Sequence, residues 1–194
     1  KFIQLVNFIG QKYMVEALLP RILENGSVSF ISSSGGYGWE NKIELINEYI
    51  NLNTFEEQVG WVEGHMPIFS EGYMSDSYCF SKQCINAYVK SKVRSSEFIN
   101  KKIRVNAIAP SYTISGLTKD FNLAISQDGS EESGEKLMHD LFLKSWNGRP
   151  GTSEDMGYPL VMIGSSLFGY LSGQVIYIDF GMTGEMDYKN LLSK

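Results

Sequence analysis

The sequence has little cysteine and no extended apolar run. Its two cysteines, Cys79 and Cys84, fall in one expected helix at a spacing that points them to different sides, so a disulfide between them is not expected. Free thiols favour a reducing compartment, and we expect a cytoplasmic location. No run of about 18 apolar residues occurs, so the sequence offers no obvious membrane-spanning helix.

The sequence also lacks basic clusters and the signatures of metal sites and hydrolases. Its 17 basic residues are outnumbered by 22 acidic ones, which gives a net charge of -5 and argues against a nucleic-acid partner. The two histidines, His65 and His139, have no neighbouring ligands at a suitable spacing, so no metal is expected. No Gly-x-Ser-x-Gly elbow and no paired catalytic carboxylates occur.

What the sequence does contain is the pattern of one α/β domain. With 43% hydrophobic and 20% charged residues, the chain has an ordinary globular composition. Short apolar runs predict buried strands, and longer segments between them predict helices. The strands are expected at residues 28–31, 104–108 and 174–178, and helices at residues 2–23, 42–50, 55–62, 76–100, 152–167 and within 111–148. This alternation predicts a Rossmann-like, doubly wound parallel sheet with helices on both faces.

Two of these helices carry further signals. In the first helix, apolar residues at four-residue steps predict the buried face. These residues are Leu5, Ile9, Tyr13 and Ala17, with Val6 and Leu18 beside them. In the last helix, Thr152 or Ser153 is expected to cap the N-terminus, with acidic residues in the first turn.

Polar residues follow the expected strands at their carboxyl ends. Ser33 follows the first strand, residues 110–115 follow the second, and Asp179 follows the third. In a doubly wound sheet, ligands bind beyond the carboxyl ends of the strands. Position alone therefore predicts a binding site at this edge of the sheet.

Tyr78 and Lys82 supply a candidate acid–base pair. Because they are four residues apart on an expected helix, their side chains face the same way. A phenol with a pKa of about 10 is a poor acid–base catalyst at neutral pH, and a cation about 4.5 Å away would lower that pKa by roughly two units. On spacing alone, a half-buried tyrosine beside a solvated lysine is the more common meaning of this pattern.

The surroundings of this pair resemble the short-chain dehydrogenase/reductase family. Tyr78 to Lys82 matches the family's Tyr-x-x-x-Lys, including the serine before the lysine. Four other segments resemble, in order, the helix with the active-site asparagine, the strand that delivers the catalytic serine, the strand before the nicotinamide loop, and the last strand with its turn. They are residues 6–20, 28–33, 104–110 and 172–181. The resemblance covers essentially all of the chain outside residues 40–70.

The resemblance implies an NAD(P)-dependent oxidoreductase that interconverts a secondary alcohol and a carbonyl. Tyr78 would exchange a proton with the substrate oxygen, and Lys82 would lower the pKa of that phenol and bind the nicotinamide ribose. Ser33, selected by alignment from three adjacent serines, would polarise the carbonyl. Asn7 would anchor a water between Lys82 and solvent, although a polar residue that caps helix contacts is the alternative for Asn7.

The family's cofactor loop corresponds here to Pro110, Ser111, Thr113 and Ser115. Ser111 stands where the family usually has glycine, which leaves the path of the loop open, and Phe180 is a similar departure. The glycine-rich dinucleotide fingerprint and the residue that selects NAD or NADP lie upstream in the family and are not in this sequence. We therefore expect that residues 1–194 are a partial domain, with the cofactor half missing and the edge of the first strand exposed.

An insertion at about residues 40–70 separates Ser33 from Tyr78, which are 78 − 33 = 45 positions apart. Long insertions at this point are typical of the bacterial 3α-hydroxysteroid dehydrogenase/carbonyl reductase group, in which the insertion is thought to reshape the tetramer face and leave a dimer. This resemblance implies a homodimer and a bulky hydrophobic substrate, for example a 3α-hydroxysteroid. A surface excursion without function is the alternative for the insertion.

Four aromatic residues fall in the segment that forms the family's substrate lid. They would either contact the substrate or pack against one another within the lid. They are Tyr112, Phe121, Phe142 and Trp146. Two rival functions remain open from the sequence. One is a non-catalytic scaffold or ligand-binding protein that retained the site residues, and the other is a different ketoreductase of the same family, such as one acting on acyl thioesters.

Overall fold

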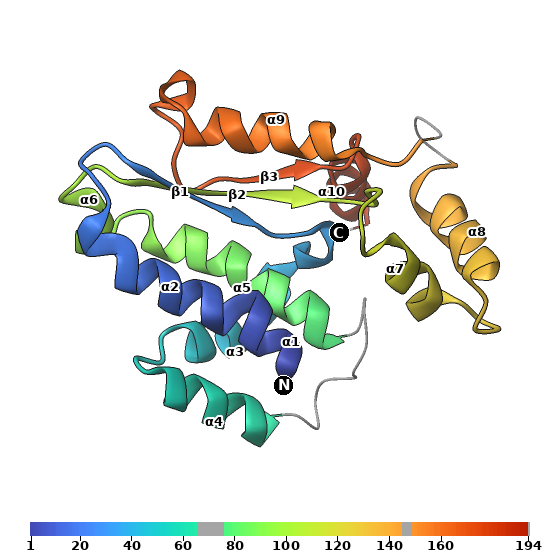
Figure 1. The fold of residues 1–194 in the computed structure, drawn as a ribbon, viewed down its shortest axis with the longest axis horizontal. Helices are drawn as coiled ribbons and strands as arrows, with labels where there is room; N and C mark the ends of the chain where they lie inside the picture. Colours follow the sequence, from blue (N-terminus) through green and yellow to red (C-terminus); the bar gives the residue numbers. More distant parts are fainter. Residues whose placement is uncertain (66–75, 145–148, 194) are drawn as a thin grey trace.

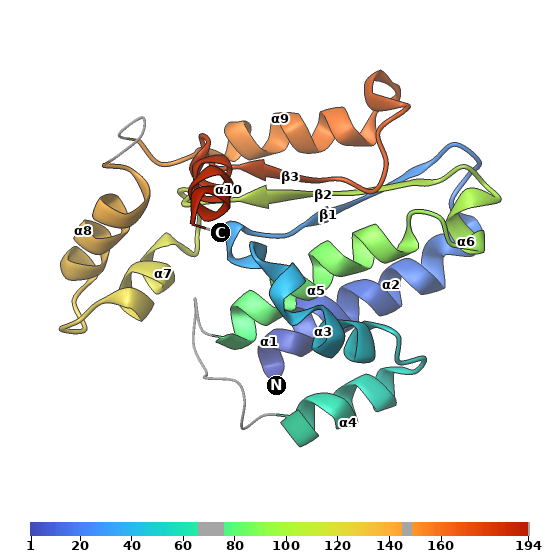
Figure 2. The same cartoon turned by 180° about the vertical axis from the view of Figure 1, so that it is seen from behind.

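The computed structural model describes residues 1–65, 76–144 and 149–193. Three strands form one parallel sheet in the order β1-β2-β3. The strands are β1 (Ser27–Ile31), β2 (Arg104–Pro110) and β3 (Val175–Ile178). Helices α2 (Gly10–Leu18) and α5 (Asp76–Lys92) lie on one side of the sheet, and α9 (Ser153–Gly164) lies on the other (Figures 1 and 2). The predicted doubly wound parallel sheet is confirmed.

Strand β2 is the buried centre of the sheet, and two of its polar residues tie it to the segment that follows α9. The guanidinium of Arg104 donates to the carbonyl oxygens of residues 163–165 and of Phe168, at 2.7 to 3.1 Å. The amide of Asn106 donates to Leu171 and accepts from the backbone of the same turn. A cation at the carboxyl end of a helix is favourable, so Arg104 both caps α9 and fixes it on the sheet.

The first helical segment is continuous from Phe2 to Arg21, but its buried face differs from the prediction. It consists of α1 (Phe2–Gln4), a π-helical turn (Leu5–Ile9), α2, and a 3₁₀ turn (Leu19–Arg21). Of the predicted residues, Ile9 is buried and Leu5 is half-buried, but Val6, Tyr13, Ala17 and Leu18 are exposed. The other buried residues of the segment from the π-helical turn onward are Phe8, Lys12, Val15 and Leu19. Successive four-residue steps each advance about 40° beyond a full turn, so the predicted stripe drifted off the buried face.

Helix α5 is shorter than the predicted segment 76–100. It ends at Lys92, and α6 (Ser96–Ile99) follows after a turn. The turn carries Phe98 into the core, where its side chain is 1% exposed. Cys79 and Cys84, both on α5, are not joined in a disulfide.

The insertion forms two helices, α3 (Ile43–Ile50) and α4 (Phe55–His65), close to the predicted segments. Both pack beside α5 and the π-helical turn through an aromatic cluster. The ring of Tyr49 stacks on Trp61 at 4.5 Å and on Phe80 of α5 at 5.9 Å. The insertion therefore shares the core of the domain and is no loose surface excursion.

Three further helices complete the described chain. Helices α7 (Thr118–Ile125) and α8 (Glu131–Phe142) form a pair beyond the carboxyl ends of the strands, within the predicted segment 111–148 (Figure 1). Helix α10 (Met182–Leu192) was not predicted. Within the described ranges no strand pairs with the outer edge of β1, and no helix is both long and apolar enough to cross a membrane.

Candidate active site

A cavity of about 740 Å³ lies at the carboxyl ends of β1 and β2. Its walls come from the first helical segment, the loops after β1 and β2, helix α5 and the α7–α8 pair. All eight site residues predicted from the sequence line it. They are Asn7, Ser33, Tyr78, Lys82, Pro110, Ser111, Thr113 and Ser115.

Tyr78 and Lys82 reach this cavity from consecutive turns of α5. The Lys82 Nζ lies 5.7 Å from the centroid of the Tyr78 ring. It donates a hydrogen bond of 3.1 Å to the carbonyl of Ile31, the last residue of β1. The contact fixes the ammonium between helix and strand, with only 8% of the residue exposed.

Burial controls the pKa values of both groups. It lowers the pKa of Lys82 to about 8, because the charged ammonium loses water. It raises the pKa of Tyr78, an effect that a hydrogen bond with Ser33 opposes and the nearby Cys79 reinforces. The expected lowering of the Tyr78 pKa is therefore wrong for this structure, because loss of solvent outweighs the hydrogen bond with Ser33.

Ser33 is the serine of its cluster that contacts Tyr78. It caps a 3₁₀ turn (Ser34–Gly36), and its Oγ accepts from the Gly35 N–H at 3.1 Å. Ser32 turns the other way and is buried against α5, where its hydroxyl oxygen lies 3.2 Å from the Lys82 carbonyl oxygen. Ser32 and Ser33 thus have distinct surroundings, and Ser33, the serine selected by alignment, is the one bonded to Tyr78.

Asn7 lies in the π-helical turn, and its amide donates to the Ser81 hydroxyl at 3.2 Å. The Ser81 hydroxyl in turn donates to the Tyr78 carbonyl at 2.6 Å, which links the two helices next to the site. The turn closes with the Gly10 N–H bonded to the Leu5 carbonyl, and a Cβ at Gly10 would lie 2.9 Å from that oxygen. Single π turns of this kind often occur at functional sites.

The loop after β2 follows a path that serine tolerates at position 111. Ser111 is not among the residues with positive φ, so its replacement of glycine causes no strain. The hydroxyl of Thr113 donates to the Ser111 carbonyl at 2.9 Å, and the Ser115 Oγ accepts from the Leu117 N–H at 3.2 Å. Thr113 therefore keeps acceptor capacity toward the cavity, and Ser115 keeps a donor.

Asp179 lies apart from the main cavity. It lines a neighbouring cavity of about 170 Å³. Its carboxylate accepts from the N–H groups of Gly181 and Thr183 at 2.9 and 2.8 Å, where α10 begins. The prediction that all three strand ends meet at one site thus holds for β1 and β2, while Asp179 serves as a helix cap.

Tyr112, Phe121 and Phe142, which the resemblance assigns to a substrate lid, line the main cavity, and the rings of Tyr112 and Phe142 also lie 6.5 Å apart. Trp146 lies outside the described residues. The ring of Phe121 meets the ring of Tyr78 edge-on, with centroids 6.0 Å apart. The sequence reasoning missed eight apolar wall residues because an apolar pattern does not distinguish core from cavity wall. They are Phe2, Ile3, Val6, Ile31, Ile114, Leu117, Met138 and Met156.

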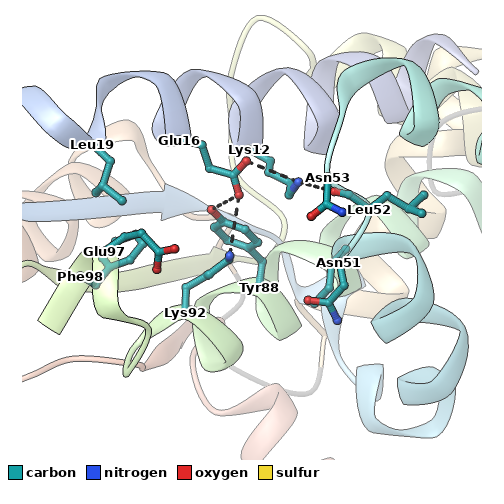
Figure 3. A pocket seen from close by; sticks show the side chains of 11 residues that line it. Lys12, Glu16, Leu19, Asn51, Leu52, Asn53, Tyr88, Lys92, Glu97 and Phe98 are labelled. Carbon is teal, nitrogen blue, oxygen red and sulfur yellow. Dashed lines mark hydrogen bonds and ion pairs between the residues drawn. The ribbon is translucent and has the colours of Figure 1, made fainter.

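A separate cavity of about 310 Å³ lies away from this site, between α2, the end of α3 and the last turns of α5. Figure 3 shows Glu16 in it, facing Lys12, Tyr88 and Lys92. The Glu16 carboxylate accepts from the Tyr88 hydroxyl at 3.1 Å and pairs with Lys12 at 3.4 Å and Lys92 at 3.9 Å. The described residues contain no group of three or more His, Cys, Asp or Glu side chains arranged to hold a metal.

Comparison with known proteins shows what the chain is similar to. A family model described as "Enoyl-(Acyl carrier protein) reductase" matches residues 68–183. Coniferyl-alcohol dehydrogenase of Pseudomonas sp. is 24% identical over 91% of this chain and 63% of its own length. The 3-oxoacyl-[acyl-carrier-protein] reductase FabG of Chlamydia muridarum is 30% identical over 47% of this chain and 32% of its own.

The fold is also similar to solved structures. The 3-alpha-hydroxysteroid dehydrogenase from Pseudomonas sp. B-0831, complexed with NADH, aligns with a TM-score of 0.72 at 14% identity, over 95% of this chain and 66% of that one. The chain thus spans less than two thirds of the length of these relatives. Because the family match extends over more than half of its residues, the chain belongs to the short-chain dehydrogenase/reductase family.

Proposed function

We propose that this chain is the catalytic part of an NAD(P)-dependent oxidoreductase that interconverts a secondary alcohol and a carbonyl. The observation that carries the proposal is the convergence of Asn7, Ser33, Tyr78 and Lys82, from three separate segments, on one cavity. Residues 1–194 are proposed to be one partial domain of the Rossmann type. The family membership and the shared parallel fold support this reading.

Tyr78 is the proposed proton carrier. In alcohol oxidation its phenolate accepts the hydroxyl proton of the substrate, and in carbonyl reduction its phenol returns that proton to the oxygen. Ser33 donates to Tyr78 in the free site, and when substrate binds it turns this hydroxyl hydrogen to the same substrate oxygen and holds it in place. Both groups act on one atom, so their mutual contact is the geometry that the reaction needs.

Lys82 and Asn7 are proposed to connect Tyr78 to solvent. The Lys82 ammonium uses one donor on Ile31 and keeps others for the cavity. Asn7 is proposed to anchor a water between Lys82 and solvent, next to its contact with Ser81. This arrangement gives the proton of Tyr78 a route out of a buried site.

The residues present fit a nicotinamide cofactor. The family's cofactor loop needs an acceptor for a carboxamide N–H and a donor for a phosphate oxygen. Thr113 and Ser115 keep these capacities at the cavity wall, and the remaining Lys82 donors suit ribose hydroxyls. Pro110 and Ser111 are proposed to form the start of the same loop. A bound nicotinamide supplies the hydride acceptor or donor of the reaction.

The proposed substrate is bulky and largely apolar. The cavity wall opposite α5 is aromatic and aliphatic, from Phe121, Met138 and Phe142, and none of the described lining residues is an Asp or Glu. A 3α-hydroxysteroid, an aromatic alcohol such as the one that names the Pseudomonas relative, or another bulky carbonyl fits such a wall. An acyl-thioester ketoreductase is the second candidate, favoured by the FabG relative and by the description of the family model.

We further propose a homodimer in the cytoplasm. Helices α3 and α4 cover a face of α5 with the chain's own Ile46, Tyr49 and Trp61, and this covered face supports the dimer that the insertion implies. The cytoplasmic location is supported by the two thiols that form no disulfide.

The proposed function is tested with the full-length protein. Coniferyl alcohol, a 3α-hydroxysteroid and a 3-oxoacyl thioester are each offered with NAD or NADP, and formation or loss of the reduced nicotinamide is followed. We expect turnover of at least one bulky alcohol or ketone and saturable binding of the reduced cofactor by its fluorescence. Absence of cofactor binding by the full-length protein would favour the non-catalytic scaffold instead.

A further inference from the structure

Asn86 is buried on α5 one turn beyond Lys82, and its side chain joins three elements. It is 0% exposed. Its Oδ1 accepts from the Ser32 hydroxyl at 2.6 Å, and its Nδ2 donates to the Gly36 carbonyl at 2.9 Å and to the Tyr177 hydroxyl at 3.3 Å. The amide therefore connects α5 to the loop after β1 and to β3 with both of its polar atoms.

The backbone of that loop lies directly on α5. A Cβ at Gly36 would be 2.6 Å from the Asn86 Nδ2 and 3.0 Å from the Lys82 carbonyl. Gly36 does not have a positive φ, so glycine is required at this position by the close approach and not by the backbone conformation. The contact leaves the loop no room to slide along the helix.

The two loop residues bonded to Asn86 stand on either side of Ser33. Ser32 precedes Ser33, Gly36 follows it by three residues, and the Gly36 N–H closes the turn on the Ser33 carbonyl at 2.9 Å. Holding both ends of so short a segment determines where the Ser33 hydroxyl lies relative to Tyr78. Asn86 itself does not line the cavity.

We propose that Asn86 is a positioning residue that holds Ser33 against Tyr78 by clamping both ends of the Ser32–Gly36 loop to α5. The inference rests on the proposed function, because Ser33 must meet the same oxygen as Tyr78. A displacement of about 1 Å in a group of this kind lowers turnover about 100-fold. Loss of the clamp is therefore expected to damage catalysis without removing any group from the cavity.

The test compares Asn86→Ala with Gln83→Ala in the full-length protein. Gln83 is the matched control: it is buried on the same helix, and its amide donates to the same loop, at 3.4 Å, but to Tyr37 beyond the clamped segment. The probes are coniferyl alcohol and a 3α-hydroxysteroid with NAD or NADP. Turnover, its pH profile, and hydrogen exchange of the peptide that contains the loop are measured for each variant.

Asn86→Ala is expected to lower kcat about 10- to 100-fold and to move the rising limb of alcohol oxidation to higher pH. The shift follows because the Ser33 hydrogen bond lowers the pKa of Tyr78, while the other influences on that phenol, its burial and Cys79, stay in place. The loop amides should exchange at least 10-fold faster. Gln83→Ala should change none of the three.

A merely structural role would lower melting temperature and activity together and leave the pH profile in place, and this result would overturn the proposal. Unchanged loop exchange in Asn86→Ala would overturn it as well. If that variant does not fold, Ser32→Ala is used instead, because it removes only the Ser32–Asn86 hydrogen bond of the clamp. It must move the rising limb of alcohol oxidation to higher pH, by less than Asn86→Ala is expected to. A wild type that turns over no probe refutes the proposed function, and loop exchange then still decides whether Asn86 holds the loop.

Discussion

Helix α5 carries the spacing Tyr-x-x-x-Lys twice, and the two pairs have almost the same internal geometry. The Lys82 Nζ lies 5.7 Å from the Tyr78 ring, and the Lys92 Nζ lies 5.6 Å from the Tyr88 ring. Both lysines are also preceded by a serine. The spacing and the distance therefore do not distinguish a candidate catalytic pair from any other.

The surroundings of the two pairs differ in what contacts the phenol oxygen. Tyr78 is bonded to Ser33, a neutral donor that stabilises the phenolate, and it faces the cavity of about 740 Å³. Tyr88 donates to the Glu16 carboxylate, as Figure 3 shows, and burial together with that negative charge raises the pKa of Tyr88. A phenol held by a carboxylate stays protonated, so the second pair cannot exchange a proton near neutral pH.

The largest expected effect comes from removing the two hydroxyls separately. Tyr78→Phe should lower turnover by about 10²- to 10⁴-fold, because general acid–base catalysis contributes about that factor. Tyr88→Phe should retain wild-type turnover. Steady-state rates with the best substrate of the full-length protein provide the measurement, and circular dichroism verifies that both variants are folded. Equal losses in the two variants would mean that spacing, and not surroundings, defines the pair.

Replacing the two lysines sharpens the comparison through stability. Burial lowers the pKa of Lys82 to about 8, below its unfolded value, so the unfolded chain binds more protons between that pH and about 10.5. The buried ammonium therefore destabilises the fold to its full extent below about pH 8, and the unfolding free energy rises as the pH increases toward 10.5. Lys82→Met should stabilise the fold by up to about 3 kcal/mol at neutral pH while abolishing turnover.

The matched variant is Lys92→Met, whose side chain is 27% exposed. Lys92→Met should retain wild-type turnover. Its unfolding free energy should still rise between about pH 8 and 10.5, as in the wild type. Chemical denaturation between neutral and alkaline pH measures both variants. A Lys82→Met protein less stable than wild type at neutral pH would contradict the desolvation argument.

Much of the fold was predictable because its signals are local. Apolar runs located the three strands, and Thr152 forms the predicted cap as a full capping box with Asp155. Helix α10 was missed because its apolar residues do not form one stripe: Met186 and Leu191 are exposed, and burial is confined to its first turn. The end of α5 was missed because the turn after Lys92 is stabilised by the packing of Phe98 in the core. Such a contact between distant segments leaves no local signal in the sequence.

The candidate site was predictable in its residues but not in its energetics. The motif and strand-end positions brought Ser33, Tyr78 and Lys82 together correctly. The direction of the Tyr78 pKa depends on burial by segments far apart in the sequence, which no spacing reveals. Asn86 and Arg104 escaped notice for the same reason, since a buried polar side chain looks like a surface one until its backbone partners are known.

The smallest expected effect concerns the carboxylate that sets the second pair apart. Glu16→Gln removes the negative charge that faces Tyr88, Lys92 and the nearly buried Lys12. Because Glu16 is 35% exposed, we expect a loss of only about 1–2 kcal/mol in unfolding free energy, with turnover unchanged. Glu24→Gln is the control, since its pair with Lys102 is exposed and its loss should leave the melting temperature unaltered. An equally small loss of unfolding free energy in both variants would show that packing alone stabilises the Tyr88–Lys92 pair. The Glu16 carboxylate would then not be what distinguishes this pair from Tyr78–Lys82.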